Sequence, residues 1–382
     1  MQQRILLVGP RVRHVHTGVA VAFELLISGL AAAGIDASIV DTQWGGSVRN
    51  SGRFNLKRMF IVGVCVVHAW WKTLNCQTLY MPISTSRLGF IRDSMIIRFA
   101  ALLKRRIVVH LHGSGLKPLY ENSSERARKM MRQTLTRVDC YVVLGDLLRD
   151  QFSFVPGWED KTRVVLNGTP IDEKAIADLS QKSPPTNGEP WRFLYLSNLM
   201  LTKGYLELVE ACHILLQQGY SNFQCNLCGE FLGIVAENDS VSVEDRETEF
   251  LQRIKAPPLS DHVHYHGTVS GSQKDAFLRE AHALVLPTYY PWEGQPLSIN
   301  EALAWATPVV STRHRGIPEQ VLDRENGYFV EPGNAESLAA CLKSFLDDKV
   351  PYEAFSRNAR KHFENNFTNA QHLAKLIPLL VD

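Results

Sequence analysis

Several features that would place the chain in a special class of proteins are absent from its sequence. Its seven cysteines show no regular spacing, so we expect a reducing compartment and no disulfide framework. No secretory signal opens the chain, and the longest apolar run, residues 59–71, is about thirteen residues, too short to cross a bilayer. No nucleic-acid-binding motif or low-complexity tract occurs. We therefore expect a globular cytoplasmic protein that does not bind nucleic acid.

Motifs for dinucleotides and metals are also lacking. The first loop, residues 10–18, contains one glycine, Gly18, whereas a dinucleotide fingerprint is Gly-X-Gly-X-X-Gly. A dinucleotide-dependent oxidoreductase is therefore a low-ranking alternative. Two patterns look like metal ligands, but one is a lone Cys-X-X-Cys in an apolar strand and the other is three alternating histidines that no nearby carboxylate completes to a plausible site. These residues are Cys225, Cys228, His262, His264 and His266. We expect no metal site at either place.

Charge is unevenly distributed along the chain. The net charge of the 382 residues is +2, but residues 1–182 hold 25 Lys and Arg against 14 Asp and Glu, and the remainder holds 16 against 25. Two explanations stay open: chance variation of the surface, or a basic N-terminal half that meets an anionic acceptor or membrane face. A cluster of bases near the apolar run could rest on such a membrane. It comprises Arg49, Arg53, Lys57, Arg58 and Lys72.

Short apolar strands alternate with helical stretches in both halves, which indicates an α/β protein with parallel sheets covered by helices. In the first half we predict a helix over 18–33 and strands at 5–8, 37–40, 78–81, 107–111, 140–144 and 163–166. A Pro- and Gly-containing stretch, 181–190, reads as a linker. Beyond it we predict strands at 192–197, 224–228, 263–266, 283–286, 308–311 and 327–330. Helices are expected at 240–255 and from 352 onward, with a break near 367–368.

The most informative stretch carries Glu293 and Glu301, eight residues apart. Glu293 lies in a Gly- and Pro-rich loop after the strand at 283–286, and Glu301 lies just inside the following helix. A loop that joins the C-terminal end of a strand to a helix N-terminus is a common phosphate site in α/β proteins. Two carboxylates there can bind hydroxyl groups through charge-assisted hydrogen bonds. A sugar nucleotide has both a diphosphate and hydroxyls.

Two further side chains stand at similar loops. Lys203, followed by Gly204, lies at a helix entrance, where its ammonium adds to the positive end of the helix dipole. Beside the carboxylate pair, this position favours a phosphate ligand over an ordinary surface lysine. His112 follows the strand at 107–111 and precedes Gly113, so it can contact a ligand, whereas His110 is expected to be structural.

Together these residues resemble the retaining GT-B glycosyltransferases, specifically glycosyltransferase family 4, whose domain is called glycosyl transferases group 1. The family has two glutamates separated by seven residues, here Glu293-Gly-Gln-Pro-Leu-Ser-Ile-Asn-Glu301. A downstream signature resembles residues 312–319 and 326–333. The match covers about 193–348 well, and the N-terminal half only in strand order, Gly18 and the loop at His112.

The resemblance implies two Rossmann-like domains that face each other across a cleft. Residues 1–182 would form the N-terminal acceptor-binding domain, and residues 191–350 the C-terminal nucleotide-sugar-binding domain. Residues 351–382 would form helices that return toward the N-terminal domain.

Roles for individual residues follow from the same resemblance. Glu293 would bind hydroxyls of the donor sugar, His112 would contact that sugar near the reacting carbon, and Lys203 would bind the diphosphate. Glu301 would hold the ribose. The other substrate-binding positions are Gly18, Asn198, Gly204, Gly294, Gln295, Leu297 and Ser298.

One position departs from the family pattern. Asn198 stands where the family usually has an arginine, so a neutral amide replaces a bidentate cation. Either Lys203 and helix N-termini suffice, or Arg313 or Arg315 contributes positive charge, or activity is weak.

The implied activity is that of a hexosyltransferase. It would move a hexose from a UDP- or GDP-sugar to a hydroxyl of a glycan or lipid-linked acceptor, with retention by front-face attack. No cofactor or metal is expected, because no Asp-X-Asp pair occurs. The setting would be surface polysaccharide, lipopolysaccharide or glycolipid synthesis, in the cytoplasm or peripherally at the inner membrane face. Two alternatives stay open: a nucleotide-sugar epimerase of GT-B architecture, and a catalytically weak sugar-nucleotide-binding subunit, which Asn198 favours.

Overall fold

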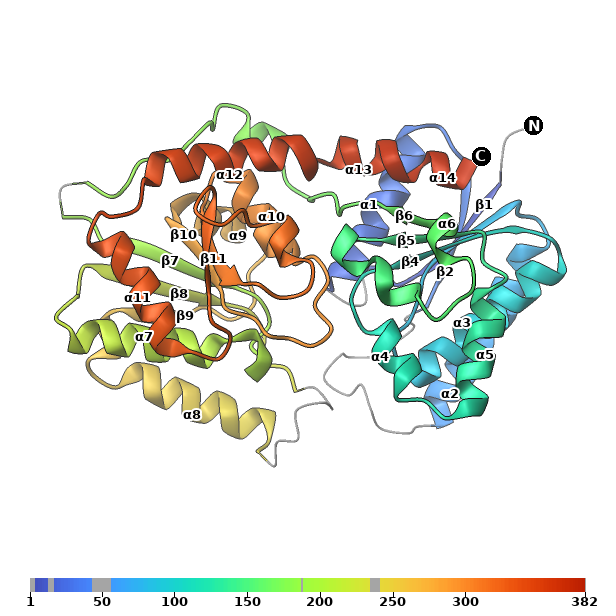
Figure 1. Ribbon diagram of the computed structural model, residues 1–382, viewed down its shortest axis with the longest axis horizontal. Helices are drawn as coiled ribbons and strands as arrows, with labels where there is room; N and C mark the ends of the chain where they lie inside the picture. The colour runs from blue at the N-terminus through green and yellow to red at the C-terminus, as the bar shows by residue number, and fades with distance from the viewer. Residues whose placement is uncertain (1–3, 13–16, 43–55, 187, 234–240, 382) are drawn as a thin grey trace. The chain divides into compact units, whose positions relative to one another are not determined.

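The computed structural model describes residues 4–12, 17–42, 56–186, 188–233 and 241–381. The chain forms two compact units, each built on a six-stranded parallel sheet (Figure 1). The N-terminal unit comprises Met1–Pro170, Trp292–Gln295 and Phe367–Asp382. The C-terminal unit comprises Ile171–Pro291 and Pro296–Asn366. The α/β class with two Rossmann-like units is therefore confirmed.

The N-terminal sheet has the strand order β2-β1-β3-β4-β5-β6. Its strands are β1 (Ile5–Gly9), β2 (Ala37–Asp41), β3 (Thr78–Pro82), β4 (Arg106–Leu111), β5 (Cys140–Val143) and β6 (Thr162–Val164). Every residue of β1, β3 and β5 is buried, which explains their continuous apolar sequence, since a parallel strand is covered on both faces.

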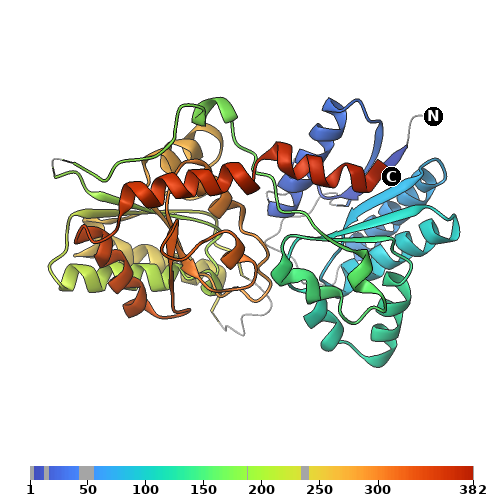
Figure 2. The same ribbon diagram turned by 45° about the horizontal axis from the view of Figure 1, so that its top comes forward.

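Helices cover both faces of this sheet. They are α1 (Gly18–Ala32), α2 (Leu56–Thr73), α3 (Arg87–Leu102), α4 (Leu116–Glu121), α5 (Glu125–Leu135), α6 (Trp158–Lys161), α13 (Asn369–Leu376) and α14 (Pro378–Val381), with the 3₁₀ helix η2 (Asp146–Phe152). One core joins α2 and α3 to the sheet through residues such as Val66 and Ile97. The other joins α1 to α13 and α14 through residues such as Phe23 and Leu376, and Figure 2 shows α13 beside α1.

The C-terminal sheet has the order β12-β11-β10-β7-β8-β9. Its strands are β7 (Trp191–Leu196), β8 (Phe223–Cys228), β9 (Val263–Tyr265), β10 (Ala283–Leu286), β11 (Val309–Thr312) and β12 (Gly327–Val330). Its helices are α7 (Tyr205–Gln217), α8 (Val243–Lys255), α9 (Gly271–Glu280), α10 (Leu297–Ala304), α11 (Ala335–Leu346) and α12 (Tyr352–Asn366). Short 3₁₀ helices are η3 (Glu173–Ile176), η4 (Leu201–Lys203), η5 (Leu259–Asp261) and η6 (Ile317–Glu319).

The units depart from the predicted domain boundaries 1–182, 191–350 and 351–382. The chain joins the C-terminal unit from Ile171, before the predicted linker. Lys182 fixes the start of that linker there, because its backbone N–H donates to Ser356 Oγ at 2.6 Å and its Nζ donates to Thr307 Oγ1 at 2.7 Å. Helix α12 packs on α10 and belongs to the C-terminal unit, so only residues 367–382 join the N-terminal unit.

Candidate functional site

Lys203 and Glu301 lie in segments that follow two neighbouring strands of the C-terminal sheet, Lys203 in η4 after β7 and Glu301 in α10 after β10. Strands β7 and β10 pair in parallel, with Phe193 opposite Ala283. Their C-terminal ends therefore lie at the same edge, which is where open α/β sheets bind ligands. A hydrogen bond from Tyr289 N to Thr202 O, at 2.8 Å, joins the two loops.

Lys203 is buried at the end of η4, and its Nζ lies 5.0 Å from the centroid of the Tyr290 ring. Gly204 follows with φ +80°, and a Cβ at this position would lie 2.5 Å from Pro287 O. Only glycine fits both this left-handed conformation and this close contact. The turn at Gly204 thus holds Lys203 against the loop after β10, directly before α7 begins.

Glu301 lies on α10 with 7% of its surface exposed. Its Oε1 accepts a hydrogen bond from Lys274 Nζ, on α9, at 2.5 Å. Burial raises the pKa of Glu301, and the adjacent Lys274 ammonium opposes that rise. Lys274 is a neighbour of candidate residue Glu301 that was not predicted from the sequence, since it is 27 residues away on another helix.

The start of α10 is held by polar contacts beneath it. Leu297 and Ser298 are its first two residues, and Pro296 precedes them without a side-chain cap. Gln320 Nε2 donates to Pro296 O at 2.9 Å and to Asn300 Oδ1 at 2.6 Å. The first backbone N–H groups of a helix have no intrahelical acceptor, so a rigid first turn can receive an anion.

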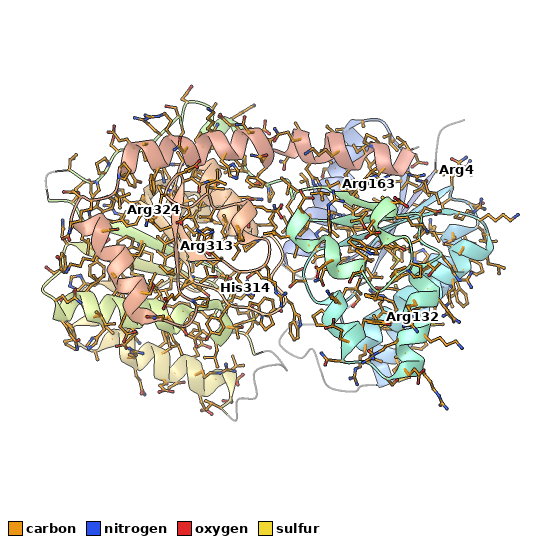
Figure 3. All side chains as sticks on the ribbon, in the orientation of Figure 1. Arg4, Arg132, Arg163, Arg313, His314 and Arg324 are labelled. Atoms are coloured by element: carbon orange, nitrogen blue, oxygen red, sulfur yellow. The ribbon has the colours of Figure 1, made fainter. Side chains whose placement is uncertain are left out.

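The two bases proposed to replace the arginine that the family usually has at position 198 are both exposed. Arg313, labelled with His314 in Figure 3, forms an ion pair with Asp323 at 2.7 Å and stacks 4.3 Å from the Phe329 ring centroid. Arg315 is exposed. Asn198 is half-buried, and its carbonyl oxygen accepts from Tyr195 OH at 3.1 Å.

Glu293 belongs to the other unit. The loop Trp292–Gln295 packs on the loop after β4, where Ser114 N donates to Trp292 O at 3.4 Å. A Cβ on Gly294 would lie 2.7 Å from His112 O, so glycine permits this close approach. The structure therefore places the loop that holds buried Glu293, Gly294 and Gln295 against the loop of His112 in one unit, and places Lys203 and Glu301 after neighbouring strands in the other. Convergence of the two groups stays a prediction.

His112 is a neutral imidazole in this environment. Burial lowers its pKa to about 3, and the positive charge that His372 can take up adds to this effect. Its ring lies 4.0 Å from that of His110, which bonds to Tyr80 OH through Nδ1 at 2.8 Å. Within the described part of the chain, His112 Nε2 has no hydrogen-bond partner. It can therefore exchange a hydrogen bond with a ligand hydroxyl.

Gln295 adds an amide side chain to the loop that packs against the loop of His112. Its Oε1 accepts from Asn167 N at 2.6 Å, which fixes the side chain. Its Nε2 and Asn167 Oδ1 are buried, and neither has a partner among the described residues. Such orphaned polar atoms are costly unless a ligand or water satisfies them.

Gly18 is the first residue of α1, and Thr17 caps this helix by accepting from Ala20 N at 3.3 Å. Of the predicted basic cluster, Arg49 and Arg53 lie outside the described residues, as do the side chains of Lys57 and Arg58. No group of three His, Cys, Asp or Glu side chains in the described ranges is placed to hold a metal ion.

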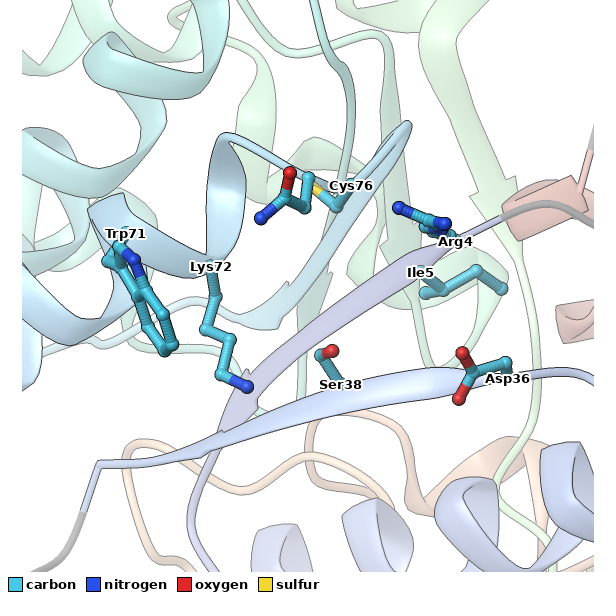
Figure 4. Close-up of a pocket in the computed structure, with 8 residues that line it drawn as sticks. Arg4, Ile5, Asp36, Ser38, Trp71, Lys72 and Cys76 are labelled. Carbon is cyan, nitrogen blue, oxygen red and sulfur yellow. The ribbon is translucent and has the colours of Figure 1, made fainter.

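A cavity of about 330 Å³ lies at the end of the N-terminal sheet where its strands begin, whereas His112 follows the end of β4 (Figure 4). Arg4 and Asp36, which directly precede β1 and β2, line it together with Trp71 and Lys72. None of the predicted site residues is among its lining. It is therefore distinct from the candidate site.

Known proteins resemble this chain in the fold of both units, and a family model matches most of its C-terminal half. The two units have the GT-B glycosyltransferase fold: the crystal structure of HepE from Anabaena in complex with UDP is similar over 99% of this chain and 100% of that one, with a TM-score of 0.71 and 18% identity. Residues 177–362 match the family model Glycosyl transferases group 1. That match, together with the fold, supports the group 1 glycosyltransferase family.

Two curated relatives match a smaller share of this chain than HepE does. The amylovoran biosynthesis glycosyltransferase AmsK from Erwinia amylovora is 30% identical over 190 residues, which are 49% of this chain and 43% of that protein. The capsular polysaccharide biosynthesis glycosyltransferase CapM from Staphylococcus aureus is 27% identical over 175 residues, 46% of this chain and 42% of that protein. The matches thus span less than half of each relative. Across the described ranges, no helix combines the length and apolar character needed to traverse a membrane.

Proposed function

We propose that the protein is a glycosyltransferase that moves a hexose from a UDP- or GDP-sugar to a hydroxyl of a glycan or lipid-linked acceptor. The observation that carries the proposal is the group 1 match over 177–362, the segment in which Lys203 and Glu301 follow adjacent strands. The names of the amylovoran and capsular relatives support surface polysaccharide synthesis as the setting. Structures of HepE with UDP and UDP-glucose support a UDP-sugar as the donor.

In the proposed donor site, the diphosphate lies beside Lys203 and the first backbone N–H groups of α10. Both present fixed positive potential, which stabilises the charge that develops on the leaving diphosphate. Glu301 accepts hydrogen bonds from the ribose hydroxyls. The Lys274 ammonium at 2.5 Å favours the ionised form of Glu301 and orients its carboxylate, so that it can serve as this acceptor.

The proposed chemistry uses Glu293 and His112 on the sugar. Glu293 binds donor-sugar hydroxyls, and the neutral His112 imidazole contacts a hydroxyl near the reacting carbon. The acceptor oxygen forms the new bond to the anomeric carbon as the bond to the diphosphate breaks, and the acceptor proton passes to the leaving phosphate. Attack on the face that the diphosphate leaves gives retention. No metal takes part in this scheme.

A donor screen tests the proposal. Thermal shift is measured against UDP- and GDP-sugars and the corresponding diphosphates, and the best donor is then incubated with and without acceptor glycans. A transferase raises its melting temperature with one donor class and releases nucleotide faster when an acceptor is present. Interconversion of the donor sugar without acceptor would instead indicate the epimerase.

One observation favours the second candidate, a catalytically weak binding subunit. Asn198 supplies no cation, and Arg313 is engaged with Asp323. Donor binding without turnover across the acceptor panel would support this alternative over the transferase.

A further inference from the structure

Exposed hydrophobic side chains are concentrated on two adjacent helices of the N-terminal unit. Thirteen large hydrophobic side chains are exposed in the described part of the chain, and eleven of them lie between Met59 and Leu102. Scattered exposed apolar residues are ordinary, but a contiguous group marks a contact surface. The concentration on α2 and α3 therefore needs a physical explanation.

The spacing of these residues shows that they share one side of each helix. On α2, Phe60, Val64, Val67 and Trp71 follow the i, i+4, i+7, i+11 pattern of a single helical face. Phe60 is 73% and Trp71 is 60% exposed, whereas Cys65, Val66 and Ala69 on the opposite side are buried in the core. Helix α2 is therefore apolar toward the core and also away from it.

Helix α3 continues the same surface. Its exposed residues Leu88, Ile91, Met95 and Leu102 also repeat at helical spacing, and Leu102 is 77% exposed. The two helices are neighbours (Figure 1), joined by a hydrogen bond from Trp70 Nε1 to Met95 O at 3.1 Å. We call this surface the α2–α3 face; it consists of Phe60, Val64, Val67, Trp71, Leu88, Ile91, Met95 and Leu102.

The sequence segment that contains this face is basic, although the side chains of four of its bases, at 49, 53, 57 and 58, lie outside the described part of the structure. Between Thr42 and Tyr120 the sequence holds twelve Lys and Arg and one acidic residue, Asp93. Asp93 is buried and pairs with Arg92 at 2.7 Å, so this pair adds no net charge and the remaining bases of the segment are unopposed by an acidic residue within it. Arg87 and Lys104 are exposed at the two ends of α3, and Lys72 lies beside Trp71 at the cavity of Figure 4. The excess charge of the N-terminal half thus comes from the segment that contains the apolar face.

We propose that the α2–α3 face docks on an anionic phospholipid bilayer, with its apolar side chains in the interface and the surrounding bases at the headgroups. An apolar face bordered by Lys and Arg is the combination that binds anionic membrane surfaces. Docking of a second copy would bring two basic segments together, and their repulsion opposes it. The inference is independent of the transfer reaction, since it requires neither donor nor acceptor.

Vesicle flotation of the purified full-length protein tests this inference. Vesicles of phosphatidylcholine alone are compared with vesicles that also contain phosphatidylglycerol. We expect binding to the anionic vesicles, weakened by salt, and at least about a tenfold loss of binding in the double variant V67S/W71S. The matched control is Leu147→Ser, which removes an exposed apolar side chain of the same unit that belongs to η2 and not to α2 or α3.

A second pair of variants tests the electrostatic part. R87Q/K104Q should reduce binding to anionic vesicles, whereas K255Q/K361Q, at exposed positions of the C-terminal unit, should not. The inference is overturned if anionic vesicles do not bind the wild type, or if V67S/W71S binds like the Leu147→Ser control. It is also overturned if size-exclusion chromatography shows a wild-type dimer that V67S/W71S dissociates.

Discussion

Lys274 Nζ lies 2.5 Å from Glu301 Oε1, and this ion pair connects α9 to the helix that carries the second predicted carboxylate. Replacing Lys274 with Met leaves a buried carboxyl without its cation. We expect a loss of about 2 kcal/mol in the free energy of unfolding, less than for a fully buried pair because 24% of the Lys274 side chain is exposed. Donor affinity should fall as well, since Glu301 loses the group that orients it.

The pH dependence gives this variant a distinctive signature. Acid protonates Glu301 and removes the uncompensated charge, so the stability deficit of Lys274→Met should shrink as the pH falls. Urea unfolding at several pH values measures it, with Lys255→Met on α8 as the control. A deficit independent of pH would mean that the charge of the pair is unimportant.

The turn at Gly204 should tolerate no side chain. An alanine there would adopt φ near +80° and place its Cβ 2.5 Å from Pro287 O. Gly219 has φ +85°, but no atom lies within 4 Å of the position that a Cβ would occupy, so Gly219→Ala experiences the backbone penalty alone. We expect Gly204→Ala to destabilise the protein by about 1–3 kcal/mol more than Gly219→Ala. Equal melting temperatures would show that the turn adapts without cost.

The close approach at Gly294 should matter for turnover more than for stability. A Cβ there would lie 2.7 Å from His112 O, so Gly294→Ala must displace the loop that carries Glu293. We expect turnover to fall by about tenfold or more, because small displacements of reacting groups are costly. Gly63→Ala, where nothing lies within 4 Å, is the control and should leave turnover unchanged. Unaltered turnover in Gly294→Ala would argue against a catalytic role for this loop.

His282 should make the protein less stable in mild acid. Its burial, with the charges of Lys182 and Arg192, lowers its pKa to about 4, and Arg192 N donates to its Nδ1 at 2.9 Å. Between about pH 6.5 and that value the unfolded chain binds a proton that the folded chain does not, so stability falls as the pH falls, by up to about 1.4 kcal/mol per pH unit.

The variant His282→Gln should flatten this dependence between pH 7 and 5. Tryptophan fluorescence reports unfolding of the region around His282, because the Trp191 ring lies 5.4 Å from the His282 ring. Other buried histidines titrate in both proteins, so the difference between the two curves is the informative quantity. Parallel curves for wild type and variant would contradict the prediction.

The twelve strands found in the described part of the chain could all be predicted from the sequence, and the signal is strongest for fully buried strands such as β1, which consist of an uninterrupted apolar run. The helical region 240–255 and the break near 367–368 could be predicted too, and the structure has α8 and the start of α13 there. These signals are local, so they need no knowledge of packing.

Other features depend on packing and could not be predicted. The ion pair of Glu301 with Lys274 joins separate helices, and no local pattern selects Lys274 among the other lysines. The amphipathic sequence of α12 does not say which sheet it covers, and it packs in the C-terminal unit. The run at 59–71 is apolar on both sides of α2, so its exposed face can be identified only once the core is known.

The most direct test of the central claim is calorimetric binding of the best nucleotide sugar and of its nucleoside diphosphate and monophosphate. If Lys203 binds the diphosphate and Glu301 the ribose, Lys203→Ala should weaken the sugar nucleotide and the diphosphate by about tenfold or more while affecting the monophosphate little. Glu301→Gln should weaken all three, and Lys255→Ala should weaken none. Unchanged affinities in both Lys203→Ala and Glu301→Gln, or no binding of any nucleotide sugar, would contradict the account.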